Sequence, residues 1–390
     1  MNSSTTQFPS FSFRELAKVI KINLASGNFQ ALMMFAAPGS GKTVFATQFL
    51  PQILADHHGI DVSEVGLVIE KPARRKADEM AGVAMPIEAN EDDQAIGFNE
   101  GDWYTQFTPS PIVVNIRKTG KRVGILLLDE AGQAGNPEQK LLSDCFDADE
   151  HSIGGTPIER EWIVVGTTNR TEDKAGSFKI LSQNIDRVLP CNMVVPVEDW
   201  IEDYCIPHDI NPIVQECALA YSDQGFFADA VPAGQEVFNT RRSTIRASKH
   251  LDAFMLSEEF DGNVPRWMEK MLAGNMGPAS SKILVDYIHR RDQIPTAGDM
   301  MSNPEGCMVP EQTGFQMVAA NIAMAQVKDV RTATAALKYI TRLRTDLQVT
   351  LGVKLMTISS KAGWMISDPV AHKFVDDFQQ YLPLAWGEMN

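Results

Sequence analysis

The residues with the clearest chemistry form a glycine-rich turn, Ala36-Ala37-Pro38-Gly39-Ser40-Gly41-Lys42-Thr43. An apolar run that favours a strand precedes the turn, and a helix-compatible segment follows it. Glycines in this setting let backbone N–H groups curl around phosphate oxygens, and the helix N-terminus favours negative charge. The lysine should reach the β- and γ-phosphates of a nucleotide, and the threonine hydroxyl should ligate Mg²⁺. We therefore predict ATP binding by Pro38, Gly39, Ser40, Gly41, Lys42 and Thr43.

Polar residues also end two later apolar runs. Asp129 and Glu130 follow Gly124–Leu128, and Asn169 follows Trp162–Thr168. The carboxyl ends of parallel strands meet at the edge of the sheet where ligands bind. We expect Asp129 to hold Mg²⁺, directly or through water, and Glu130 to orient and polarise the attacking water. An amide at the same edge suits Asn169 to hold that water against the γ-phosphate.

The elements that must position these residues alternate along the first half of the chain. Helical spacing of Phe13, Leu16, Ile20 and Leu24 predicts a helix over Phe13–Ala25. A second helix is predicted from Lys42 to about Ala55. The runs that predict strands are Gln30–Phe35, Val65–Ile69, Gly124–Leu128, Trp162–Thr167 and Met193–Val197. Strands that alternate with helices indicate an α/β fold with a parallel, five-stranded sheet.

From about Pro196 helical patterns replace strand-like runs. The predicted helices are Glu198–Glu202, Pro212–Gln224, Thr240–Leu256, Trp267–Ala273, Ser280–Arg291, Gly314–Lys328 and Thr332–Leu347. The acidic stretch Glu258–Pro265 contains Gly and Pro, which is typical of a linker. We predict three regions: a nucleotide-binding core over 1–197, a helical lid over 198–257 and a helical C-terminal region over 258–390.

The composition narrows the function classes. The chain has 390 residues with 44% apolar and 22% charged, which is typical of a globular protein, and its net charge is −15. An acidic chain is a poor non-specific ligand for nucleic acids and anionic membranes. No apolar run approaches the ~20 residues of a membrane span, and the first twelve residues lack an apolar signal core. Five cysteines without a CxxC pair indicate free buried thiols, so we expect a cytoplasmic protein.

Together the motifs resemble the AAA+ ATPase superfamily, with Pro38–Thr43 as Walker A, Leu126–Glu130 as Walker B and Asn169 as sensor 1. The stretch Gly166–Gly176 is similar to the MoxR-like branch, particularly its divergent bacterial and phage members. The resemblance covers about Phe13 to Leu256. It implies an αβα core with a helical lid, Mg²⁺-dependent ATP hydrolysis and assembly into a homo-oligomeric, hexameric ring. It also implies chaperone-like remodelling of a protein client, for which a protein with a von Willebrand factor A domain is a frequent partner in the family.

Two arginine positions fit this resemblance. Asp186-Arg187-Val188 matches the site of the arginine finger, and Phe238–Ser243 resembles the sensor 2 motif at the start of a lid helix. Guanidinium groups stabilise the negative charge that spreads over the γ-phosphate during phosphoryl transfer. Arg187 would act on a neighbouring subunit's nucleotide, and a lid arginine would act within its own subunit. Arg241 and Arg242 compete for the lid role, and we favour Arg242.

Three further features of the sequence indicate a function less specifically. The basic cluster, defined as Lys71, Arg74, Arg75 and Lys76, is typical of a solvated face, although in a ring it could face the central pore and contact a polymer. For Trp103 and Tyr104 we favour core packing over a partner contact. The segment His151–Ile158, with Gly154-Gly155, resembles the hairpin that precedes sensor 1.

Two other functions remain open at this point. One is a nucleic-acid motor or loader in phage or bacterial DNA metabolism, which the basic cluster favours and the acidic balance opposes. The other is a nucleotide-switched scaffold that hardly turns over, which Glu130 and Asn169 oppose.

Overall fold

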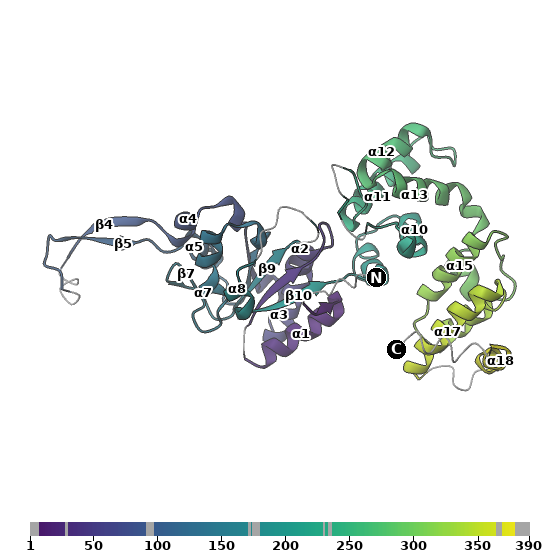
Figure 1. The fold of residues 1–390 in the computed structure, drawn as a ribbon, viewed down its shortest axis with the longest axis horizontal. Helices are drawn as coiled ribbons and strands as arrows, with labels where there is room; N and C mark the ends of the chain where they lie inside the picture. The colour runs from purple at the N-terminus through teal and green to yellow at the C-terminus, as the bar shows by residue number, and fades with distance from the viewer. Residues whose placement is uncertain are drawn as a thin grey trace. The chain divides into compact units, whose positions relative to one another are not determined.

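A six-stranded parallel sheet forms the centre of the first of two units in the computed structural model (Figure 1). The structure describes residues 8–27, 30–90, 97–170, 173, 180–228, 231–232, 236–363 and 369–378. The first unit is Met1–Pro196 and the second is Val197–Asn390. The further division of the second unit at residue 257 stays a prediction.

The strands of the sheet lie in the order β1-β10-β2-β9-β6-β3. Their bounds are Ser10–Phe11 for β1, Ala31–Phe35 for β2, Gly66–Glu70 for β3, Gly124–Leu128 for β6, Trp162–Thr168 for β9 and Val188–Met193 for β10. The predicted α/β fold with a parallel sheet is confirmed. The sheet has six strands instead of five because the two-residue β1 pairs with the outer edge of β10.

Helices cover both faces of this sheet. On one face Met33, Leu126 and Val164 are buried with residues of α5 (Pro111–Lys118) and α7 (Ser143–Phe146). The other face is covered by α3 (Leu50–His58), which contacts β6, and by α1 (Phe13–Ala25), which packs on α3. Alternating strand residues point to opposite faces, so each apolar strand can fill both layers. The shorter helices of this unit are α2 (Lys42–Val44), α4 (Ala77–Ala81), α6 (Asn136–Leu141) and α8 (Ser182–Arg187).

The helix after the glycine-rich turn is not uniform. It starts as α2, continues as a π-helical turn over Phe45–Phe49 and becomes α3. The ring of Phe13 lies 5.1 Å from that of Phe45 and 5.3 Å from that of Phe49. Helix α1, which begins at Phe13 as predicted, therefore packs directly behind the turn.

The predicted strand over Met193–Val197 is wrong, because the strand is β10, Val188–Met193. Pro190 and Asn192 lie inside β10, so its residues do not form the continuous apolar run of a buried strand. Proline lacks an N–H and is tolerated only where no ladder partner is needed. The N–H of Asn192 points outward to the carbonyl of Pro9. Pro190 faces the same side two residues earlier, where β1 no longer pairs.

Two hairpins interrupt the sheet connections. The short one, β7 (Ser152–Ile153) with β8 (Thr156–Pro157), lies where His151–Ile158 predicts a hairpin. The long one, β4 (Ala84–Glu88) with β5 (Trp103–Phe107), is not predicted. Its Trp103 is 66% exposed, so the prediction of core packing is wrong for that residue.

The second unit is helical, and none of its described residues forms a strand. Its helices are α9 (Val197–Trp200), a π-helical turn (Ile201–Cys205), α10 (Pro212–Tyr221), α11 (Arg241–Met255), α12 (Arg266–Met276), α13 (Pro278–Arg290), α14 (Ala297–Ser302), α15 (Thr313–Ala325), α16 (Val330–Ile340), α17 (Thr345–Lys361) and α18 (Pro369–Phe378). The single helix predicted over Thr332–Leu347 is wrong because α16 and α17 are separate. The break follows from a long-range bond, since the N–H of Arg344 donates to Oε1 of Gln316 at 2.9 Å and not to a helix carbonyl.

All five cysteines are buried free thiols, as predicted. Burial raises the pKa of Cys191 and that of Cys205 to about 12, so both stay protonated at neutral pH. No helix in the described part of the chain is long and apolar enough to cross a bilayer.

We predict that Gly124→Ala destabilises the first unit. A Cβ at Gly124 would lie 2.6 Å from the ring of Trp162, which is fully buried and donates from Nε1 to the carbonyl of Lys121. Overpacking of this kind costs about 1–3 kcal/mol. Thermal unfolding should show a lower midpoint for this variant. Gly274→Ala is the control, because nothing lies within 4 Å of that Cβ and alanine favours a helix. An unchanged midpoint for Gly124→Ala would contradict the packing described.

Candidate functional site

The glycine-rich turn joins the end of β2 to α2. Gly39 has a φ of 73° and Gly41 a φ of 98°, so both adopt the left-handed conformation that other residues rarely take. The turn stays close to β9, because the N–H of Ala36 donates to the carbonyl of Thr168 at 3.3 Å. The local sequence thus forms a tight loop of backbone N–H groups at the carboxyl edge of the sheet, as the glycine spacing predicts.

The ammonium of Lys42 lies in the mouth of this loop. It donates to the carbonyls of Ala36 at 2.7 Å and Ala37 at 3.0 Å, and to Oδ1 of Asn169 at 3.1 Å. Asn169 follows β9, which lies directly beside β2 in the sheet. The fold therefore brings together two predicted site residues that are 127 positions apart in the sequence.

The carboxylate of Asp129 is the junction of the site. Its Oδ1 accepts from the hydroxyls of Thr167 at 2.8 Å and Thr43 at 3.3 Å, and its Oδ2 lies 2.9 Å from Nζ of Lys71. Asp129 follows β6, and its N–H donates to the carbonyl of Glu70 on β3. This carboxylate thus contacts residues at the ends of β3 and β9 and at the start of α2.

Charge and hydrogen bonds control the ionisation of this junction. Burial by itself would raise the pKa of Asp129. The hydrogen bonds from Lys71, Thr167 and Thr43, with the charge of Lys71, outweigh burial and lower that pKa. The same contact with Asp129 raises the pKa of Lys71. The carboxylate and the ammonium are therefore both charged at neutral pH.

Glu130 has an unusual backbone. Its φ of 59° lies in the left-handed region, which costs a non-glycine residue free energy and is common at functional sites. Its N–H donates to Oγ1 of Thr167 at 3.0 Å, which holds this conformation. The side chain is 42% exposed, with Oε2 3.5 Å from Nζ of Lys71. Glu130 thus reaches solvent at the same edge as Asp129.

The described residues fit a magnesium nucleotide. The oxygens of Thr43 and Asp129 lie within 3.3 Å of each other and are the hard donors that Mg²⁺ prefers. Oγ of Ser40 in the loop is buried and has no hydrogen-bond partner among the described residues. The same residues hold no group of three or more His, Cys, Asp or Glu that could bind a metal by themselves. Metal binding here would therefore need the oxygens of a ligand as well.

Arg187 lies apart from this group, at the end of α8. Its guanidinium donates to Oγ of Ser143 at 2.8 Å and pairs with Asp144 at 3.3 Å and with Asp147 at 3.2 Å. The side chain is 32% exposed. It is thus a surface arginine held by acidic residues of its own chain.

Arg241 and Arg242 open α11 in the second unit and differ in their surroundings. A capping box fixes the start of the helix, because Thr240 and Ser243 exchange hydrogen bonds. The guanidinium of Arg241 lies 4.9 Å from the ring centre of Phe227, and burial lowers its pKa to about 10. Arg242 is exposed. Of the two, Arg242 is the more exposed.

Two contributors escaped the sequence analysis. The basic cluster predicts a solvated or pore-facing Lys71, but its ammonium contacts Asp129 and Glu130. The sequence motifs do not include Thr167, yet it bonds both Asp129 and Glu130. Their positions could have indicated a role at the site, because both residues stand at the carboxyl ends of strands beside β6. Of the family-like stretch after β9, residues 171–172 and 174–176 lie outside the described residues.

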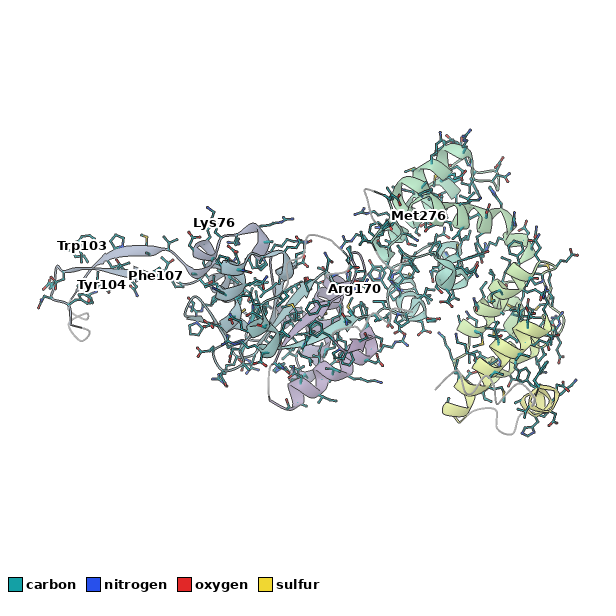
Figure 2. All side chains as sticks on the ribbon, in the orientation of Figure 1. Lys76, Trp103, Tyr104, Phe107, Arg170 and Met276 are labelled. Atoms are coloured by element: carbon teal, nitrogen blue, oxygen red, sulfur yellow. The ribbon has the colours of Figure 1, made fainter. Side chains whose placement is uncertain are left out.

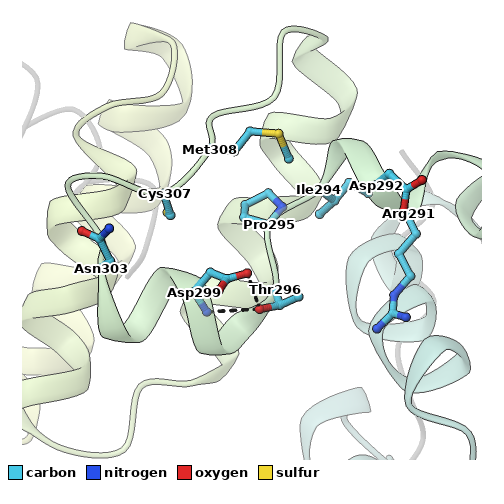
Figure 3. A pocket seen from close by; sticks show the side chains of 9 residues that line it. All are labelled: Arg291, Asp292, Ile294, Pro295, Thr296, Asp299, Asn303, Cys307 and Met308. Atoms are coloured by element: carbon cyan, nitrogen blue, oxygen red, sulfur yellow. Dashed lines mark hydrogen bonds between the residues drawn. The ribbon is translucent and has the colours of Figure 1, made fainter.

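A cavity of about 460 Å³ lies in the second unit, beside α14 (Figure 3). Several of its polar groups already have partners in the fold. Thr296 and Asp299 cap α14 through a 2.7 Å hydrogen bond, and Arg291 pairs with Glu216. We assign this cavity no part in the nucleotide chemistry, because none of the predicted site residues lines it.

The sequence matches no family model and no curated protein. Solved structures similar to the chain include PCH-2 of C. elegans, at 10% identity and a TM-score of 0.31, with 72% of this chain and 69% of that chain covered. A mutant of RuvB from Thermotoga maritima is similar at 13% identity and a TM-score of 0.28, with 94% of this chain and 93% of that chain covered. NtrX from Brucella abortus in complex with ADP is similar at 12% identity and a TM-score of 0.36, with 90% of this chain and 67% of that chain covered. All three TM-scores lie below 0.5, so the functional argument rests on the geometry of the site.

We predict that Lys71→Met lowers the Mg²⁺ concentration needed for nucleotide binding. The ammonium competes with the metal for Asp129, so its removal should strengthen metal binding about two- to tenfold. Binding of a fluorescent ATP analogue across a Mg²⁺ titration measures this. Arg74→Met, an exposed residue of the same basic cluster, is the control. An equal Mg²⁺ requirement in both variants would contradict a competing role for Lys71.

Proposed function

We propose that the chain is a Mg²⁺-dependent ATPase of the AAA+ type. One observation carries the proposal: Lys42, Thr43, Asp129 and Asn169 meet at the carboxyl edge of three neighbouring strands, with Glu130 beside them. Strand β9 lies between β2 and β6, so the amide of Asn169 stands between the glycine-rich loop and the acidic strand. A phosphate-binding loop, a metal-binding pair of oxygens and a carboxylate open to solvent are the groups that ATP hydrolysis needs.

Each residue has a separate role in this mechanism. Lys42 and the loop N–H groups bind the phosphates, while Thr43 and Asp129 hold Mg²⁺. The bound metal supplies positive charge that offsets the charge of the phosphates. Glu130 orients the attacking water and accepts its proton, and the amide of Asn169 holds that water in line. Lys42 must first exchange its carbonyl partners for phosphate oxygens.

The contact of Lys71 with the carboxylates bears on this mechanism. Oε2 of Glu130 lies 3.5 Å from Nζ of Lys71, which also pairs with Asp129 at 2.9 Å. Lys71 therefore occupies the space between the two carboxylates that the mechanism uses. Asp129 would have to give up its contact with Lys71 before it could hold Mg²⁺, so opening of this ion pair would accompany nucleotide loading.

We further propose that Arg187 acts on the nucleotide of a neighbouring copy. Its position on the surface of the first unit supports this role, since it is not among the residues that meet at the site. Its contacts with Asp144 and Asp147 would hold the guanidinium ready at a subunit interface. The exposed Arg242 is the proposed lid arginine. The MoxR-like resemblance makes a hexameric ring the preferred assembly.

For the process that is coupled to ATP hydrolysis we propose chaperone-like remodelling of a protein partner, with a von Willebrand factor A domain protein as the client class suggested by the resemblance.

The main alternative function is a nucleic-acid motor. Within the basic cluster, Lys71 pairs with Asp129 and Arg75 pairs with Glu70 at 3.1 Å. Half of this cluster is therefore already neutralised by the chain itself, which disfavours nucleic-acid binding. DNA binding measured near 50 mM salt distinguishes the two functions, because a motor should bind with steep salt dependence.

We predict that Lys42→Ala abolishes nucleotide binding, whereas Glu130→Gln keeps binding and lowers the hydrolysis rate about a hundredfold or more. The first variant removes the charge that meets the phosphates, and the second removes only the base. Nucleotide binding and phosphate release should be measured together. Lys18→Ala, on the exposed side of α1, is the matched control. Tight ATP binding by Lys42→Ala would overturn the assignment of the loop, and equal negligible turnover by wild type and Glu130→Gln would favour the scaffold.

We predict that Arg187→Ala retains nucleotide binding and loses about a thousandfold in hydrolysis rate. Mixing it with Glu130→Gln subunits, which carry an intact Arg187, should restore activity at the shared interfaces. Arg117→Ala is the control, because Arg117 is also a partly exposed arginine in a surface ion pair, with Glu159 at 3.1 Å. Absence of rescue in the mixture would show that Arg187 does not act between subunits.

A further inference from the structure

The long hairpin β4–β5 leaves the first unit as a separate two-stranded sheet (Figure 1). Its strands are antiparallel, with Glu88 opposite Trp103 and Ala84 opposite Phe107. Strand side chains alternate between faces, so these four residues share one face of the hairpin. We call this face the Trp103 face.

Two aromatic side chains on the Trp103 face remain in solvent. Trp103 and Phe107 are each 66% exposed, although large aromatic residues are normally buried. They stand four residues apart on one strand, about 13 Å, and line the hairpin in Figure 2. The face is therefore an apolar surface that the described part of the chain does not cover.

The opposite face of the hairpin differs. Tyr104 stacks on Phe98 with ring centres 4.6 Å apart, and Ile87, paired with Tyr104, is partly buried. This face thus has its own apolar contacts. Among the described residues of the hairpin, the two most exposed aromatic rings lie on the Trp103 face, while Met85 on the opposite face is 47% exposed.

The charged side chains among the described residues of the hairpin are all acidic. The sequence between Lys76 and Arg117 has no lysine or arginine. Glu88 is exposed directly across from Trp103, and Glu100 and Asp102 are exposed near the end of the hairpin. The carboxylate of Asp102 accepts from the N–H of Asn99 at 2.8 Å and stays at the surface. Such a surface repels phosphate backbones and anionic lipids.

The base of the hairpin is firmly joined to the unit. The N–H of Thr108 donates to the carbonyl of Val83, and the N–H of Val83 donates back to Oγ1 of Thr108 at 2.8 Å. The buried hydroxyl of Ser110 donates to the carbonyl of Met80 on α4 at 2.6 Å. The hairpin is therefore anchored to the first unit by hydrogen bonds at its base. The chain that connects β3 to the hairpin begins at Lys71.

We propose that the Trp103 face binds a cationic, partly apolar segment of a partner protein. Arginine or lysine side chains would pair with Glu88 and stack on the ring of Trp103, while apolar residues would cover Phe107. Charge complementarity selects this occupant over a nucleic acid or a membrane. It also disfavours a second copy of this chain, because the copy carries a net charge of −15. The inference goes beyond the proposed ATPase, since binding at this face requires neither nucleotide nor a neighbouring subunit.

The test is fluorescence anisotropy with the full chain and a short fluorescein-labelled peptide in which arginine alternates with leucine. We expect nucleotide-free binding that weakens as salt rises from about 50 to about 200 mM. Trp103→Ala and Glu88→Lys should each weaken binding about tenfold or more, because an aromatic anchor and its charge partner dominate such interfaces. Gln106→Ala, an exposed change on the opposite face of β5, should leave the affinity unchanged.

A second peptide, with glutamine in place of arginine, tests the charge requirement. Equal affinity for both peptides, or equal affinity of Trp103→Ala and Gln106→Ala, would overturn the proposal. Self-association that is lost in Trp103→Ala, measured by sedimentation, would also overturn it, because the occupant would then be a second copy. ATP hydrolysis without peptide should be the same in all these variants, so a failure here leaves the proposed ATPase standing.

Discussion

The buried carboxylate of Asp129 is the interaction on which the rest of the first unit depends. A charge with so little exposure needs partners, and it takes them from Thr43, Lys71 and Thr167. These partners come from the start of α2 and the ends of β3 and β9, so one side chain fixes the relative positions of three strand ends, including that of β6, and of the start of α2. The same oxygens suit a metal ion. The contacts that order this edge are thus the same contacts that the proposed nucleotide site would use.

The sequence predicts the parts of the fold that depend on local patterns. Helix α1 and strands β2, β6 and β9 have apolar periodicities that decide their type, and the glycine-rich turn has a spacing with few other uses. The local pattern does not predict strand β10, because Pro190 interrupts its apolar residues, and this proline is tolerated only because β1 ends beside it. It does not predict the contact of Lys71 either, because the partner, Asp129, lies far along the chain. Long-range pairs of this kind have no local signature.

The exposure of the Trp103 face is a feature that the sequence alone does not predict. An aromatic pair in a chain is buried more often than not, so core packing was the natural expectation. Only the register of β4 with β5 shows that Trp103 and Phe107 share a face with Glu88. The chain from Lys71 to Ser110 joins this face to Asp129 and Glu130, the carboxylates of the proposed nucleotide site, within one unit. Lys71 lies at one end of the segment that carries the hairpin, so a conformational change at Lys71 would act directly on that segment.

The most direct test of the central claim is calorimetric titration of the intact chain with ADP, with and without Mg²⁺. The account predicts saturable binding to one site per chain. It also predicts stronger binding in Mg²⁺, because Asp129 and Thr43 then hold the metal against the phosphates. Absence of binding at millimolar ADP, or binding that is indifferent to Mg²⁺, would contradict a magnesium nucleotide site at this edge of the sheet.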